Sequence, residues 1–265
     1  MTHRPFLPLL SLLILLFASG CESKENDRLA TQPKPNAKAA PPVDAVDNGP
    51  LFKATFDRRI VRADIAKGDP ESLDFDETLA VRTYTGYKLS YDAKNNFNPT
   101  EGTISFWFEP VNWDPDFSGD SSLVFHRHKQ LVTVQFENER GAATFTVFKH
   151  YRASRFVFLI TPSLNKINYQ VKFDGDFMKR DQWYKADVTW GDGTMRFYID
   201  GELQGSGNYG PPYTRIAETG IEKGRILINP ILWKGGHESY EDLTAIDDFV
   251  IRGRALSKAE IKKNY

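Results

Sequence analysis

The chain has 265 residues, a formal net charge of −1 and charges of both signs interspersed along it. A surface that binds nucleic acid or an anionic membrane needs an excess of positive charge, so this composition excludes both kinds of binding. A single cysteine excludes a disulfide within the chain, and the folded part must therefore be held together by its core.

The first twenty residues have the layout of a secretory signal. His3 and Arg4 precede an apolar stretch from Phe6 to Ala18, and the small residues Ser19 and Gly20 follow it. The unbroken apolar part is well short of the ~20 residues that a membrane-spanning helix needs. We therefore predict that residues 1–20 are an export signal rather than a transmembrane anchor.

Residues 18–21, Ala-Ser-Gly-Cys, resemble the lipobox of bacterial lipoproteins. The resemblance implies that Cys21 becomes the first residue of the mature protein and carries diacylglycerol and a palmitate-type acyl chain, which together hold a protein stably on a membrane. It also implies export to the bacterial cell envelope, at the outer membrane or cell surface rather than the plasma membrane. The alternative is an ordinary signal peptide with a free Cys21.

Residues 21–50 are predicted to be a disordered tether behind the lipidated cysteine. Residues 22–50 contain no aromatic residue, and four prolines, at positions 33, 35, 41 and 42, lie among Lys, Asn, Ala and Asp. Such a segment cannot bury enough apolar surface to offset its ordering entropy, and its prolines keep it extended. Residues 51–265 are long enough for one substantial domain.

Alternation with a period of two runs through this domain. In the segment 102–110, Ile104, Phe106 and Phe108 take one face of a strand and Trp107 the other. The same pattern recurs at Val132, Val134 and Phe136, at Tyr184, Ala186, Val188 and Trp190, and at Met195, Phe197 and Ile199. These segments are predicted to be half-buried antiparallel strands.

Turn and cap signals complete the prediction of an all-β fold. The sequences Gly191-Asp-Gly193 and Asp200-Gly201 favour tight hairpins, so residues 183–205 are predicted to form a three-stranded meander. Helix is expected only at the end, where Ser257 and Glu260 have the spacing of a capping box ahead of Ile261. Many short strands with one terminal helical turn indicate a β-sandwich.

Four segments together resemble the laminin-G-like, concanavalin A-like lectin/glucanase superfamily. They are Phe56-Asp57, residues 102–110 (GTISFWFEP), residues 183–201 with the motifs WYKADVTW and MRFYIDG, and residues 246–257 (IDDFVIRGRALS). The resemblance implies a two-sheet antiparallel jelly-roll sandwich over residues 51–265 with a short C-terminal helical turn. Residues 121–180 match only in their strand pattern.

The sequence lacks the motifs of the enzymes that use this fold. Retaining glucanases need two carboxylates ~5 Å apart, which the superfamily supplies as Glu-x-Asp-x-x-Glu on one strand, and no such pattern occurs. No Gly-x-Ser-x-Gly is present either. We therefore predict a protein that is not an enzyme and has no catalytic residues.

Three tryptophans are the candidate ligand-binding residues. A sugar needs a flat aromatic face for its apolar side and polar groups for its hydroxyls. Trp107 is expected on the outer face of its strand, Trp233 follows an apolar run, and Trp113 lies in an Asn-Trp-Asp-Pro loop. For each of them the alternative is plain structural packing.

Calcium is the predicted cofactor, in a structural role. The superfamily resemblance implies a clamp between the first and last strands through an aspartate of the closing motif, here Asp247. Calcium takes six to eight oxygen ligands, so Asp57 is the expected second carboxylate. The alternative is that Asp247 and Asp248 pair with Arg252 or Arg254.

Three functions remain open at this stage. The first is a non-catalytic, membrane-anchored domain that recognises a glycan or cell-envelope polysaccharide. The second is an adhesion or scaffolding domain that binds envelope proteins, and the third is a divergent carbohydrate-active enzyme. An exposed aromatic beside amides would favour the first, a large apolar patch the second, and two converging carboxylates the third.

Overall fold

The computed structural model describes residues 49–56, 62–69, 71, 89–111, 113–115, 129–138, 141–150, 154–161, 168–209, 224–228 and 244–265. All of them belong to the unit Ala37–Tyr265. The predicted export signal, the lipidated Cys21 and almost all of the tether lie outside the described residues. Within these ranges no helix is long and apolar enough to cross a membrane.

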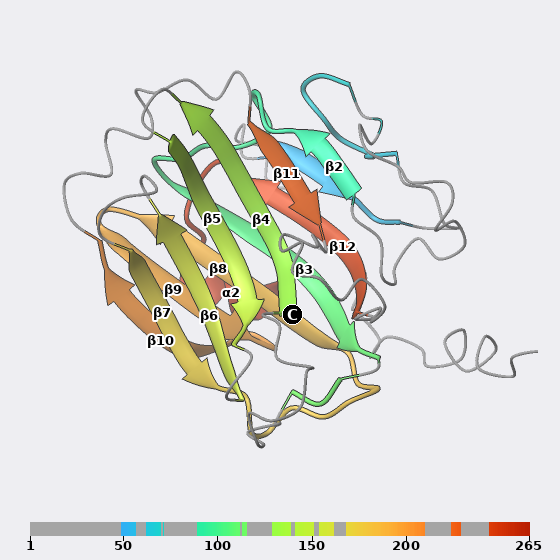
Figure 1. Cartoon of the computed structure of the whole chain (residues 1–265), viewed down its shortest axis with the longest axis vertical. Coiled ribbons are helices and arrows are strands. Elements are labelled where there is room, and N and C mark those ends of the chain that lie inside the picture. The colour runs from blue at the N-terminus through green and yellow to red at the C-terminus, as the bar shows by residue number, and fades with distance from the viewer. Residues whose placement is uncertain are drawn as a thin grey trace, which may run out of the picture. The chain divides into compact units, whose positions relative to one another are not determined.

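Two antiparallel sheets of six strands each form the fold (Figure 1). Sheet A has the order β1 (Phe52–Ala54), β12 (Thr244–Arg252), β3 (Gly102–Pro110), β8 (Tyr184–Gly191), β9 (Thr194–Ile199) and β10 (Glu202–Asn208). Sheet B has the order β2 (Leu89–Asp92), β11 (Arg225–Ile228), β4 (Lys129–Asn138), β5 (Gly141–Lys149), β6 (Arg155–Thr161) and β7 (Tyr169–Asp174). The prediction of an all-β, two-sheet sandwich is confirmed.

The first and last strands lie side by side although almost the whole domain separates them in sequence. Phe52 pairs with Ile251 and Ala54 with Phe249 in an antiparallel ladder between β1 and β12. On its other side β12 pairs with β3, with Ile251 opposite Ile104. This closure brings the start of the domain, the β2–β3 loop and the end of β12 to one end of sheet A.

The core lies between the two sheets and is rich in aromatic rings. The predicted inward residues of β3, Ile104, Phe106 and Phe108, are at most 1% exposed. From the opposite sheet, Phe145 packs against Trp190 of β8 with ring centroids 5.1 Å apart. Such buried aromatic faces supply most of the apolar burial that stabilises a chain without disulfides.

The predicted meander is confirmed as β8, β9 and β10. Asp192 and Gly193 between the first two strands have φ values of 48° and 71°, and Asp200 and Gly201 between the next two have 50° and 77°. Positive φ at both central residues is the requirement of the type I′ hairpin turn, which explains Asp-Gly at both places. Both turns join neighbouring antiparallel strands of sheet A.

The C-terminal segment covers part of the outer face of sheet A. Helix α2 (Lys258–Lys263) begins at Ser257 with the predicted capping box to Glu260. Ile261 of the helix and Leu256 before it are buried together with Tyr198 of β9 in a small apolar cluster. The outer face of this sheet is therefore a second, smaller interface.

Candidate functional site

A groove of about 680 Å³ opens at one end of sheet A. It is lined by parts of three segments, residues 49–51, 95–101 and 253–255, which come from the start of the domain, the β2–β3 loop and the link between β12 and α2. We call it the rim groove. Its polar side chains are Asn95, Asn98, Glu101 and Arg254.

An aromatic stack forms the support beneath the groove. Phe97 is 2% exposed and its ring lies on the indole of Trp190, with centroids 5.0 Å apart and planes 22° apart. The indole Nε1 of Trp190 donates a hydrogen bond of 3.1 Å to the carbonyl of Asn98. A Cβ atom at Gly102 would overlap the Trp190 ring, so glycine is needed there. The loop is thereby fixed to the core.

Asparagine and aspartate side chains set the path of the β2–β3 loop. The Asp92 carboxylate accepts the backbone N–H of Lys94 at 2.9 Å, and the Asn96 amide donates to the Asp92 carbonyl at 2.9 Å. Asn95 has a φ of 62°, in the left-handed region that asparagine tolerates better than most residues. The turn holds the exposed Asn95 side chain at the groove's edge.

Asn98 joins two walls of the groove. Its Nδ2 donates to the carbonyl of Gly253 at 3.0 Å, and its Oδ1 accepts the N–H of Thr100 at 3.0 Å. Because a side-chain amide has two N–H donors and two acceptor lone pairs, each end keeps capacity for one further hydrogen bond. Asn98 is thus both a structural link and a polar contact offered by a rigid loop.

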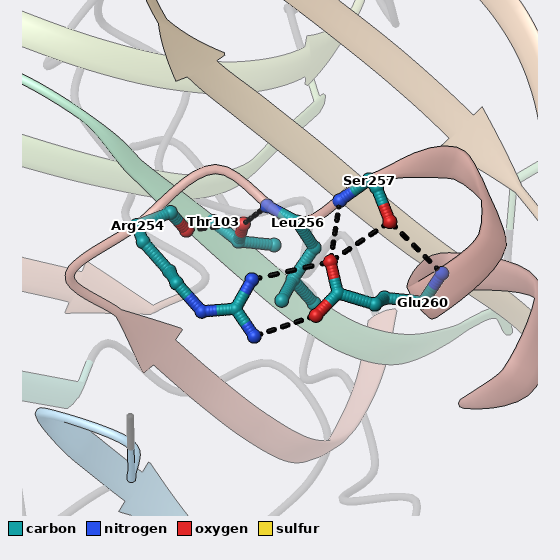
Figure 2. Close-up of polar contacts among 5 residues, drawn as sticks. All are labelled: Thr103, Arg254, Leu256, Ser257 and Glu260. Atoms are coloured by element: carbon teal, nitrogen blue, oxygen red, sulfur yellow. Dashed lines mark hydrogen bonds and ion pairs between the residues drawn. The ribbon is translucent and has the colours of Figure 1, made fainter. Parts of the chain in front are cut away.

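Arg254 lines the groove, and Figure 2 shows the polar contacts that fix its orientation. Its Nη1 and Nη2 donate to the two carboxylate oxygens of Glu260 at 3.1 and 2.6 Å. The hydroxyl of Thr103 donates to the Arg254 carbonyl at 2.8 Å and accepts the N–H of Leu256 at 2.9 Å. Both the backbone and the guanidinium of Arg254 are therefore held by neighbours.

Glu260 serves the helix cap and the arginine together. Besides Arg254, its carboxylate accepts hydrogen bonds from the backbone N–H and the hydroxyl of Ser257, at 2.9 and 2.8 Å. These bonds, first of all the one from Arg254, lower the pKa of Glu260 to about 2. Conversely, the hydrogen bond to Glu260 raises the pKa of Arg254, and the charge of Glu101 adds to that rise. The pair is ionised throughout the neutral range.

The groove offers polar groups for a ligand, while the one aromatic residue among its described lining, Phe97, is only 2% exposed. Amides, a carboxylate and a guanidinium offer donors and acceptors around an open groove, on a loop whose conformation is set by buried contacts. Glu101 is the one carboxylate among the described residues that line it, so two groove-lining carboxylates flanking one bond are not found there.

Trp107 lies on the outer face of β3, as predicted, yet it is only 5% exposed. Its ring lies 6.0 Å from that of Tyr265, with planes 32° apart, so the C-terminal segment covers it. A sugar could stack on Trp107 only after that segment moved. Its role as a ligand-binding residue stays a prediction.

Trp113 is 7% exposed and packs against Phe156, and its Nε1 donates to the hydroxyl of Thr244 at 2.9 Å. A buried indole with its N–H satisfied has the geometry of a packing residue, as the structural alternative expected. Trp233 lies outside the described residues. Neither Trp107 nor Trp113 lines the rim groove.

Of the two carboxylates predicted to bind calcium, Asp247 is among the described residues. Asp247 is half-buried in β12, and its Oδ1 accepts the N–H of Asp248 at 2.8 Å within a bulge where Asp248 has a φ of 47°. Asp57 lies outside the described residues. Among the residues that are described, no three His, Cys, Asp or Glu side chains gather in a way that could hold a metal. Structural calcium stays a prediction.

The groove residues are not among the site residues predicted from the sequence. The signal for them was a run of turn-forming residues, Asp92-Ala-Lys-Asn-Asn-Phe-Asn-Pro99, between two strands, since loops on a rigid scaffold often carry function. Arg254 was considered only as a partner for Asp247 or Asp248. Its actual partner is Glu260, six residues later, which the capping-box pattern had assigned to the helix alone.

Comparison with known proteins places the fold. The receptor-binding domain of botulinum neurotoxin C/D mosaic serotype has a TM-score of 0.54 and 15% identity over 81% of this chain and 50% of its own. The botulinum neurotoxin serotype D ligand binding domain in complex with N-acetylneuraminic acid has a TM-score of 0.53 and 15% identity over 81% and 50%. The chain thus spans about half the length of these structures, and at this identity the likeness concerns the fold alone. No curated protein matches the chain.

A family profile assigns the chain to a protein family, which these distant structures do not. The profile described as the concanavalin A-like lectin/glucanases superfamily, Laminin_G_3, matches residues 82–262, which is more than half of the chain. It covers both walls of the groove that come from the β2–β3 loop and from the end of β12. The chain therefore belongs to the concanavalin A-like lectin/glucanase superfamily.

Proposed function

We propose that this protein is a non-catalytic glycan-recognition protein and that the rim groove is its binding site. The observation that carries the proposal is the convergence of Asn95, Asn98, Glu101 and Arg254 on one groove of a lectin-superfamily fold. Sugar hydroxyls donate and accept at once, and mixed amide and charged groups satisfy both roles. The likeness to a structure described with N-acetylneuraminic acid supports the ligand class, not the ligand.

The proposal includes the place where recognition occurs. The lipobox-like residues around Cys21 support export and lipid anchoring at the bacterial envelope, with residues 22–50 as the tether. A head that binds glycan at the end of such a tether would hold the envelope and a polysaccharide together. Labelling of cells with an alkyne-bearing fatty acid tests the anchor, because a Cys21→Ala variant should lose the label.

A glycan array probed with the full chain tests the binding site. Asn95→Gly removes one amide while keeping the positive φ that the turn requires, so the loop should survive. We expect about fivefold weaker binding, the effect of one hydrogen bond worth about 1 kcal/mol. The matched control is Gln170→Ala, which deletes an exposed amide on β7, the edge strand of sheet B. This variant should bind glycan as the wild type does. Absence of any glycan binding by the wild-type chain would refute the proposal.

The divergent-enzyme alternative has one supporting observation. Burial, helped by the charge of Asp181, raises the pKa of Glu109 to about 7, which is the value that a general acid needs near neutral pH. Glu109 lies at the opposite end of β3 from the groove, and is 6% exposed. If the wild type released reducing sugar from a polysaccharide and Glu109→Gln did not, the enzyme alternative would take the place of the binding proposal.

A further inference from the structure

The charge balance of the rim groove carries an inference about its ligand. Glu101 and Arg254 are the charged side chains among the described residues that line it. Lys94 and Asp92 on the same loop carry opposite charges and are not among its lining residues. The electrostatic character of the groove therefore depends on what Glu101 and Arg254 can each offer to a ligand.

Arg254 is already neutralised. Its two Nη atoms bind the two oxygens of Glu260, the bidentate geometry that a ligand carboxylate would seek. The capping box fixes Glu260 in turn, because Ser257 donates two hydrogen bonds to it. An anionic ligand would have to displace a carboxylate that is held by four hydrogen bonds. Because its Nε is buried, Arg254 can donate only its remaining Nη–H groups to neutral hydroxyls.

Glu101 leaves an uncompensated negative charge at the groove. Its side chain is exposed, and its charge acts on Arg254 together with that of Glu260. The charges of two carboxylates thus act on one guanidinium, and Glu101, Arg254 and Glu260 together sum to −1. A carboxylate on an incoming sugar would meet repulsion, whereas a hydroxyl can donate to Glu101.

Resting on the proposed function, we propose that the rim groove selects neutral saccharides over carboxylated ones, with Glu101 and the Arg254–Glu260 pair as its specificity determinants. Taken alone, a partly buried arginine that lines the groove would suggest the opposite preference. The preference follows from Glu260, which lies outside the groove and acts by occupying the guanidinium.

An array of matched pairs tests this preference. Each neutral oligosaccharide is printed beside its counterpart carrying one sialic or uronic acid, and the full chain is applied at low and at physiological salt. We expect the neutral members to bind about thirtyfold more tightly at low salt, the effect of two like charges roughly 8 Å apart near a protein surface. Added salt should reduce the ratio, because it screens exposed charges.

Two variants test whether Glu101 and the Arg254–Glu260 pair cause the preference for neutral saccharides. Glu101→Gln should bring the ratio close to one, because it removes the negative charge that repels the acidic members. Glu260→Gln should favour the acidic members, since glutamine at this position keeps the capping box while freeing the guanidinium charge. Asp176→Asn, which removes an exposed carboxylate from the β7–β8 connection, is the control and should leave the ratio unchanged.

The outcomes separate the two proposals. Equal or tighter binding of the acidic members by the wild type, or an unchanged ratio in Glu101→Gln, overturns the charge selection and leaves glycan binding standing. Failure of the wild type to bind any member of either set overturns the proposed function and the selection with it.

Discussion

The two faces of sheet A are made by alternate residues of the same strands, yet they are stabilised in different ways. The inner face places Phe106 and Trp190 in the aromatic core. The outer face places Ser105, Asp187 and Thr189 beneath the C-terminal segment, where each is at most 5% exposed. The inner layer gains from apolar burial, whereas the outer layer loses free energy where polar groups leave water without a hydrogen-bond partner among the described residues, as the Asp187 carboxylate and the Thr189 hydroxyl do.

Asp187 and Lys185 form a buried pair of opposite charges on the outer face. Asp187 is 1% exposed, and its Oδ2 lies 4.0 Å from the Nζ of Lys185, which donates to the carbonyl of Asn264 at 2.6 Å. Burial raises the pKa of Asp187, and the charge of Lys185, the hydroxyl of Ser105 and the charge of Arg252 oppose that rise. Burial likewise lowers the pKa of Lys185. The opposite charge of each partner offsets part of the cost of burying the other.

The largest effect is expected on the inner face. Trp190→Ala removes a completely buried indole that contacts Phe97 and Phe145, so the free energy of unfolding should fall by about 3–5 kcal/mol. Urea denaturation measures the loss. Trp107→Ala, the same change on the outer face, should cost clearly less because the ring there packs against the terminal Tyr265. An equal loss at both positions would contradict the distinction between the faces.

The next effect concerns the outer pair. Lys185→Met leaves a buried carboxylate without its cation, so we expect a loss of about 3 kcal/mol at pH 8. The loss should shrink as the pH is lowered, because burial raises the pKa of Asp187 and favours its protonated form, and urea midpoints at pH 8 and pH 5 measure this. The double variant Lys185→Met/Asp187→Asn removes both charges and should recover much of the stability. A double variant no more stable than the single one would show that the pair is not the cause.

The sequence predicted the sandwich well because its signals are local. Alternation over 102–110 identified the inward face of β3, and Asp-Gly at 192–193 and at 200–201 identified both hairpins, since each of these features is a backbone or pleat requirement. The capping box of Ser257 and Glu260 was likewise readable from spacing alone.

The site was harder to predict because it depends on tertiary partners. An alternating strand says that Trp107 points outward, and cannot say that Tyr265 covers it. The groove needs three segments that meet only when β1, β12 and β3 lie side by side, and the role of Arg254 depends on Glu260 in the helix that follows. Such contacts leave no periodic signal in one sequence.

The smallest expected effect, and one of opposite sign, concerns Glu109, which also lies on the outer side of β3. Its pKa in the folded protein is about 7, raised from an ordinary value of 4.5, first by burial and then by the charge of Asp181. A carboxyl with a raised pKa holds its proton more tightly in the folded state than in the unfolded one. The free energy of unfolding should therefore fall as the pH rises from about 4.5 to about 7.

Glu109→Gln should remove that component of the pH dependence and make the protein more stable than the wild type at pH 8. A shift of this size corresponds to at most about 3 kcal/mol, and access of solvent near the strand end reduces the expected gain to about 1–2 kcal/mol. Below pH 4.5 the two proteins should unfold at the same urea concentration. Glu101→Gln, at an exposed position just before the same strand, should change stability little at either pH. Since Lys185→Met lowers stability most at high pH and Glu109→Gln raises it there, the two variants distinguish a paired buried charge from an unpaired one on the same face.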